Sequence, residues 1–144
     1  MRVRAFVFLA LLVSGAASAL DYRSVSEAAV LYDAPSQKAK PLFVIAPGTP
    51  VEVIVSLDAW VKVRDLKGDL AWIERGQLAD KRTLQVRTEG AQIRAEANDA
   101  AKLAFEAEAD VLLEFLEAGP AGWVKVRHRD GPQGFVKATQ VWGL

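Results

Sequence analysis

An internal repeat with an offset of 63 residues constrains the fold of this 144-residue chain more than any other feature. The segment WVKVR at residues 60–64 recurs at residues 123–127, and at the same offset Gly68 falls on Gly131 and Trp72 on Phe135. Turn, aromatic and apolar positions agree, so the chain contains two copies of one structural unit. The offset shortens to 60 where Val51 best matches Val111, which indicates that the copies differ in loop length.

The repeated segments have the period of β-strands. Val61 and Val63 alternate with the larger or charged side chains of Trp60, Lys62 and Arg64, which predicts one buried and one mixed face. Residues 65–69 and 128–132 follow as glycine-containing hairpin turns. The chain is therefore predicted to be all-β.

Two other segments test this interpretation. In residues 51–56, Val51, Val53 and Val55 occupy every second position and should share the buried face. Residues 102–117 are rich in Ala, Leu and Glu, which favour helices, but their apolar residues also alternate with acidic ones. The alternation predicts a half-buried strand with a bend, whose carboxylates lie on one solvent face.

The N-terminus has the pattern of a cleavable signal peptide over residues 1–19. A basic start is followed by the apolar run Ala5–Val13 and a small-residue site at Ala17–Ala19, so cleavage is expected before Leu20. The apolar run has 9 residues, against the roughly 20 that a spanning helix needs, so a retained membrane anchor is the weaker alternative. We expect an exported protein, periplasmic or extracellular, without a membrane anchor.

Composition narrows the possible partners. Removing residues 1–19 takes away two arginines and no acid, which leaves a net charge of about −2, and a nucleic-acid partner is not expected. The chain has no cysteine, so neither disulfides nor a thiol for lipid attachment exist. The polar stretch Asp80–Arg82 is the boundary between a first unit over residues 20–80 and a second over residues 81–144.

The segments Pro47–Val53, Trp60–Val63 and Trp72–Ile73, with the turn at Gly68 and their second copies, resemble the bacterial SH3-like (SH3b) family. This resemblance implies two tandem small SH3-like β-barrels, partly open, of the kind attached to exported cell-wall proteins. Repeat one departs from the family at Ala71, where a glycine usually precedes the aromatic residue. Its Leu31-Tyr32-Asp33 is similar to the signature of eukaryotic SH3 domains that bind proline-rich peptides. We interpret that similarity as coincidental, because residues 94–96 of repeat two differ and residues 74–77 lack Pro and Tyr.

The sequence offers few residues that could act in catalysis. No cysteine nucleophile is available, and the single histidine, His128, lies in a predicted turn where it should be solvated. One histidine cannot form a His-rich zinc site. The acidic residues between Glu106 and Glu117 fit a solvated strand face better than a pair of catalytic carboxylates. We therefore expect no enzyme, no catalytic residues, no metal and no cofactor.

The tryptophans beside the cations are the candidate binding residues, because an aromatic ring stacks on sugars or peptide planes while a cation pairs with a carboxylate. The alternatives are that each Trp packs under a loop at the rim and that the charges form a solvated hairpin edge. Trp72 and Phe135 are expected to pack in the core or at the rim. The candidate ligand-binding residues are Trp60, Lys62, Arg64, Trp123, Lys125, Arg127 and Arg129.

The family resemblance implies a non-catalytic binding module of the bacterial cell envelope that recognises peptidoglycan, through its stem peptide or glycan, or an envelope protein. The alternative is a structural or scaffolding protein that mediates protein–protein contacts in the periplasm. The turn of repeat two, with His128 and Arg129, adds positive charge that repeat one lacks. Anionic ligands are therefore expected to prefer repeat two.

Overall fold

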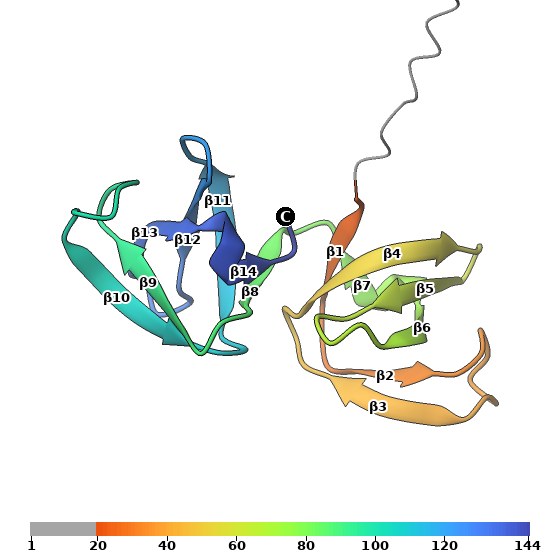
Figure 1. The fold of residues 1–144 in the computed structure, drawn as a ribbon. Helices are drawn as coiled ribbons and strands as arrows, with labels where there is room; N and C mark the ends of the chain where they lie inside the picture. The colour runs from red at the N-terminus through yellow and green to blue at the C-terminus, as the bar shows by residue number, and fades with distance from the viewer. Residues whose placement is uncertain (1–19) are drawn as a thin grey trace, which may run out of the picture.

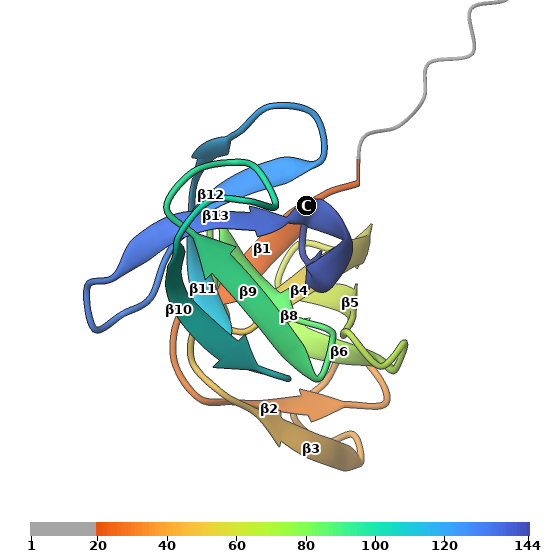
Figure 2. The same ribbon diagram turned by 60° about the vertical axis from the view of Figure 1, so that its left-hand side comes forward.

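The computed structural model describes residues 20–144, so the predicted signal peptide lies outside the described residues. The described chain forms two lobes that follow one another along the sequence, as Figures 1 and 2 show. Each lobe contains one antiparallel sheet of seven strands, and the two sheets have the same strand order. The predictions of an all-β fold and of a structural repeat are confirmed.

Repeat one forms the sheet ordered β3-β2-β6-β5-β4-β1-β7. Its elements are β1 (Tyr22–Val25), β2 (Ala29–Tyr32), β3 (Pro41–Ile45), β4 (Pro50–Ser56), β5 (Trp60–Arg64), β6 (Leu70–Glu74), the 3₁₀ turn η1 (Arg75–Gln77) and β7 (Leu78–Ala79).

Repeat two forms the equivalent sheet, ordered β10-β9-β13-β12-β11-β8-β14. Its elements are β8 (Thr83–Val86), β9 (Gly90–Arg94), β10 (Leu103–Glu108), β11 (Leu112–Ala118), β12 (Trp123–Arg127), β13 (Gln133–Lys137), the 3₁₀ turn η2 (Ala138–Gln140) and β14 (Val141–Trp142).

The predicted faces of the central strands are confirmed. Val61 and Val63 in β5 are 2% and 1% exposed, and Val124 and Val126 in β12 are equally well buried. The tryptophan before the two valines and the lysine between them face the other way and are half-buried. Each repeat has its own apolar core, and burial of these valines is a main source of its stability because no disulfide contributes.

The expected alternation of Val51, Val53 and Val55 is wrong at its last position. Val53 pairs with Val63, but Val55 pairs with Lys62, so Ile54 is an extra residue in β4. Such a β-bulge reverses the side-chain direction beyond it, and Val55 is 40% exposed.

The ambiguous segment 102–117 is strand, as predicted, and the expected bend is a tight turn between β10 and β11. Asp110 in this turn has a φ of 68°, a left-handed conformation that Asp adopts more readily than most residues. The structural equivalent of Val51 is Leu113, not Val111 as the sequence comparison indicated. Val51 and Leu113 are both fully buried, whereas Val111 is half-buried next to the turn.

The two repeats touch directly around the short connection between β7 and β8. The Thr83 hydroxyl of repeat two donates a hydrogen bond of 2.7 Å to the Gly48 carbonyl oxygen of repeat one. Nearby, the rings of Tyr22 and Trp142 meet edge to face, with centroids 5.2 Å apart. The ring contact joins the first and last strands of the described chain, β1 and β14. No helix in residues 20–144 has the length and apolar character needed to cross a bilayer.

Candidate binding surface

The outward side of the central hairpin in each repeat carries the predicted binding residues, and we call it the aromatic face. In repeat one Lys62 lies opposite Trp72, and in repeat two Lys125 lies opposite Phe135. Trp72 and Phe135 are half-buried on this face and not in the core, because the alternation of β6 and β13 turns their neighbours inward. Of the two predicted places for these rings, the core is therefore excluded and the rim is left.

The arginines of the candidate set are paired with glutamates of their own repeats. Arg64 donates from Nε and Nη2 to Oε2 of Glu52, at 2.9 and 2.7 Å, and Glu52 is 6% exposed. Arg127 makes the equivalent contacts to Glu114 at 3.3 and 2.9 Å. The hydrogen bond from Arg127 lowers the pKa of Glu114 below its ordinary value, so this carboxylate stays ionised. Each arginine is therefore paired with a glutamate of its own repeat, and a ligand carboxylate would have to compete with that glutamate.

The lysines of the candidate set differ between the repeats. Lys125 lies 3.7 Å from Glu117, and its ammonium is 5.9 Å from the centroid of Phe135. Lys62 lies beside Trp72 and takes part in no ion pair among residues 20–144. Lys62 is therefore the cation of the aromatic face that is free to meet an anionic group.

Repeat one has an open cavity beside Trp60, with a volume of about 600 Å³. The ring of Tyr32 meets the ring of Trp60 edge to face, with centroids 5.7 Å apart. The β2–β3 loop forms one wall, where the Gln37 amide donates a hydrogen bond to the Glu74 carboxylate. We call this site the repeat-one cleft, defined by its lining residues Gln37, Lys38, Trp60 and Glu74, with Tyr32 in contact with the Trp60 ring. It presents an aromatic ring next to a carboxylate.

Sequence reasoning missed Tyr32, which it treated as a coincidental similarity. The offset of 63 aligns Tyr32 with Ala95, so the repeat comparison gave Tyr32 no support. The strand register instead matches Tyr32 to Arg94, because Tyr32 pairs with Trp72 and Arg94 with Phe135. The available signal was the aromatic residue at the end of a short apolar strand. Its proximity to Trp60 depends on how β2 packs against β6, which no local pattern reveals.

The equivalent site of repeat two has different chemistry. Lys137 replaces Glu74, its ammonium lies 5.8 Å from the centroid of Trp123, and it forms a 2.7 Å ion pair with Asp99. The hydrogen bond from Lys137 lowers the pKa of the Asp99 carboxyl below its ordinary value. An internal ion pair therefore lies beside Trp123, at the position where repeat one has the hydrogen bond from Gln37 to Glu74.

Arg129 is not brought together with Trp123. It lies in the β12–β13 turn and lines a cavity between the repeats, together with His128. His128 was expected to be solvated, but it is half-buried. Its ring meets that of Phe105 edge to face, with centroids 6.1 Å apart, and its Nδ1 lies 3.3 Å from a carboxylate oxygen of Asp130. In residues 20–144 no three His, Cys, Asp or Glu side chains gather as metal ligands would.

Comparison with solved structures finds distant similarity. NlpC2 from Trichomonas vaginalis is 15% identical with a TM-score of 0.40, and the match covers 86% of this chain and 48% of that one. NlpC1 from the same organism is 14% identical with a TM-score of 0.40, covering 94% and 50%. An NlpC/P60 family protein from Bacillus cereus ATCC 10987 is 14% identical with a TM-score of 0.40, covering 85% and 56%. The chain spans about half the length of these structures.

No curated protein matches the chain. The sequence does match the bacterial SH3 domain twice, over residues 25–80 and again over residues 87–143. Each match falls on one of the two sheets and includes its aromatic face. The protein therefore belongs to the bacterial SH3 domain family and contains two tandem copies of that domain.

Proposed function

We propose that this chain is a non-catalytic binding module of the bacterial cell envelope, and that the repeat-one cleft is its peptide-binding site. One observation carries the proposal: in repeat one Trp60 stands beside a second ring and an open cavity, whereas Lys137 and Asp99 form an ion pair beside Trp123. A ligand at Trp123 would have to compete with that ion pair. A ligand at Trp60 meets an aromatic surface that is already open.

The chemistry of the cleft favours a peptide with charged groups of both signs. The Trp60 ring can stack on a peptide plane, and the Glu74 carboxylate can accept hydrogen bonds from an amino group. Lys62 lies two residues further along β5 on the same face, about 7 Å away by strand geometry, where it can pair with a carboxylate. Peptidoglycan stem peptides carry free carboxylates, and the family relationship supports them as the first ligands to test.

The remaining candidate residues have secondary roles in this proposal. Lys125 and Arg127 already contact glutamates, so an anion at repeat two would compete with Glu117 and Glu114. The preference of anionic ligands for the aromatic face of repeat two remains a prediction from the sequence.

The proposal also includes export and closure of the sheets. Removal of residues 1–19 would leave Leu20 as the mature N-terminus, which N-terminal sequencing of the secreted protein checks. Each sheet is proposed to coil into a small, partly open barrel, as the family relationship implies. Recovery of the chain from membranes with Met1 retained would contradict the export step.

The test is retention on purified cell-wall sacculi, measured as a binding isotherm. The wild-type chain should bind saturably, and Trp60→Ala should weaken binding by about tenfold, as expected when one stacking contact is lost. Glu74→Gln keeps the size of this half-buried side chain and removes its charge. It should also weaken binding, which separates ligand recognition from folding. Trp123→Ala is the matched control and should retain binding.

Two outcomes would overturn the proposal. Equal losses in Trp60→Ala and Trp123→Ala would show that the cleft is not the site. No retention of the wild-type chain would favour the alternative, a scaffolding protein with protein partners in the periplasm.

A further inference from the structure

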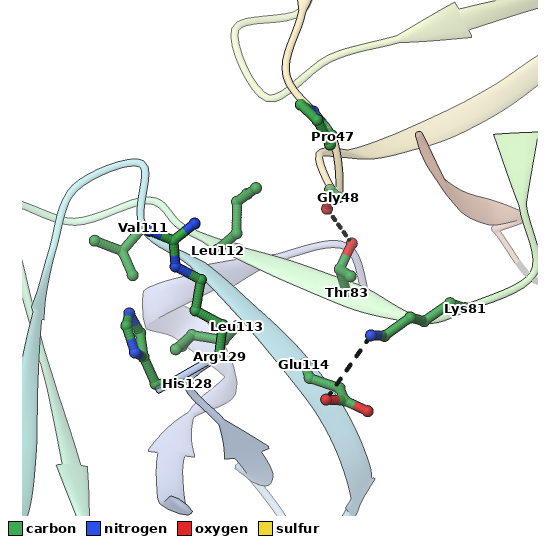
Figure 3. A pocket seen from close by; sticks show the side chains of 10 residues that line it. All are labelled: Pro47, Gly48, Lys81, Thr83, Val111, Leu112, Leu113, Glu114, His128 and Arg129. Atoms are coloured by element: carbon green, nitrogen blue, oxygen red, sulfur yellow. Dashed lines mark hydrogen bonds and ion pairs between the residues drawn. The ribbon is translucent and has the colours of Figure 1, made fainter. Parts of the chain in front are cut away.

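The cavity between the repeats has the features of a second binding site. Its volume is about 380 Å³, within the range of small-ligand sites. Pro47 and Gly48 of repeat one line one side, and β8, β11 and the β12–β13 turn of repeat two line the other (Figure 3). The hydrogen bond from Thr83 to Gly48 spans the two sides and fixes the cavity before any ligand arrives. Its residues come from both repeats, so neither repeat alone can form it.

Positive charge exceeds negative charge in the lining of this cavity, which includes Lys81, Arg129 and Glu114. Glu114 accepts its close hydrogen bonds from Arg127 and forms an ion pair with Lys81, whose ammonium is 3.9 Å away, too far for a hydrogen bond. Arg129 takes part in no ion pair among residues 20–144. Figure 3 shows Arg129 on one side of the cavity and Lys81 on the other. Two cations therefore face the cavity with hydrogen-bond donors to spare.

Apart from Thr83 and His128, the rest of the lining is apolar. Val111 and Leu112 are half-buried, and Pro47 adds a rigid apolar surface from repeat one. Leu113 contributes from the adjacent position of β11. A ligand that fits must therefore combine an anionic group with a small apolar body.

We propose that this cavity binds a monocarboxylate attached to a small apolar group, such as the C-terminal carboxylate of a peptide ending in alanine. The planar guanidinium of Arg129 matches a carboxylate with two parallel hydrogen bonds, and Lys81 supplies a second charge. The ionised Glu114 disfavours a dianion such as a phosphate monoester, because it repels the second negative charge. The inference goes beyond the repeat-one cleft, since no residue lines both sites.

The test is an NMR titration of the full mature chain with N-acetyl-alanylalanine and, separately, with its C-terminal amide. The acid should shift the methyl signals of Leu112 and Val111 and leave the Trp60 indole signal unchanged. The amide should bind at least about tenfold more weakly, since it loses the charge-assisted hydrogen bonds. Inorganic phosphate should not compete with the acid.

Two variants complete the test. Arg129→Gln in an exposed turn should weaken binding of the acid to the level of the amide, whereas Arg87→Gln, an exposed arginine away from the cavity, should leave it unchanged. Equal affinities for acid and amide, or equal effects of the two variants, would overturn the proposal. So would saturable shifts confined to Trp60, which would place the peptide in the repeat-one cleft instead.

Discussion

Gly134 in β13 is the position at which one added methyl group should be least tolerated. A Cβ atom there would lie 2.5 Å from the Arg94 carbonyl oxygen and 2.7 Å from Cγ2 of Ile93, both in β9. Real Cβ atoms do not approach backbone oxygen so closely, so Gly134→Ala must push β13 away from β9. Overpacking of this kind costs about 1–3 kcal/mol.

Repeat one shows why the clash is specific to β13. Its equivalent residue is Ala71, which is 2% exposed, so the first sheet accommodates a methyl group at the same position. The matched control for the substitution is Gly90→Ala in β9, where a new Cβ meets nothing within 4 Å. That variant should be neutral or slightly stabilised, by up to about 1 kcal/mol, because alanine restricts the unfolded chain.

Urea denaturation followed by far-UV circular dichroism measures both variants. With a typical slope of about 1–3 kcal/mol per molar urea, Gly134→Ala should lower the midpoint by about 1 M. Hydrogen exchange should show the loss of protection concentrated in β9 and β13. Equal midpoints for Gly134→Ala and Gly90→Ala would refute the reasoning, because only Gly134→Ala places a methyl group where no space exists for it.

Three further predictions concern single side chains. Arg64→Ala should lower the free energy of unfolding by about 1–3 kcal/mol, because it leaves the buried carboxylate of Glu52 without its partner. Arg127→Ala should lower it by at most about 1 kcal/mol, because the pair with Glu114 is more exposed, and a double-mutant cycle with each glutamate measures the difference. Burial, aided by the nearby Glu52 carboxylate, raises the pKa of Tyr22. The contribution of the neutral Tyr22 side chain to stability is therefore complete below the ordinary phenol pKa of 10.0, and it is lost as the pH rises through the pKa of Tyr22 in the folded state. Tyr22→Phe should remove that alkaline loss in unfolding curves recorded between pH 9 and 12, and an unchanged curve would contradict it. Val63→Ala should cost about 1–3 kcal/mol and Lys62→Ala little, and equal losses in denaturant midpoint would show that the strand faces are assigned incorrectly.

The features that the sequence predicted are those that depend on near neighbours along the chain. The burial of Val61 and Val63 follows from an alternation that is visible within five residues. The strand at residues 102–117 was predictable for the same reason, despite its helix-favouring composition. The repeat itself needed only a comparison of the chain with itself.

The features that the sequence did not predict depend on register and on packing between distant strands. The bulge at Ile54 requires two residues of β4 to face one residue of β5, which alternation alone cannot indicate. The alternation of residues 51–56 puts Glu52 on the face opposite the valines, and its burial under Arg64 follows from cross-strand register. The repeat-one cleft and the cavity at Arg129 both join segments that lie far apart in the sequence.

The short connection between the repeats has a consequence for ligands that carry several copies of one binding group. Only residues 80–82 separate β7 from β8, and the contacts of Thr83 and Trp142 join the two lobes directly. The two binding sites are therefore held at a fixed distance from each other. A bivalent ligand gains effective concentration at the second site only if the distance between its two binding groups matches the distance between the sites. A polymer with the right period would be held with high avidity, and one with a different period would bind through a single site. The short connection thus makes the two domains selective for ligands whose binding groups are spaced at one particular distance.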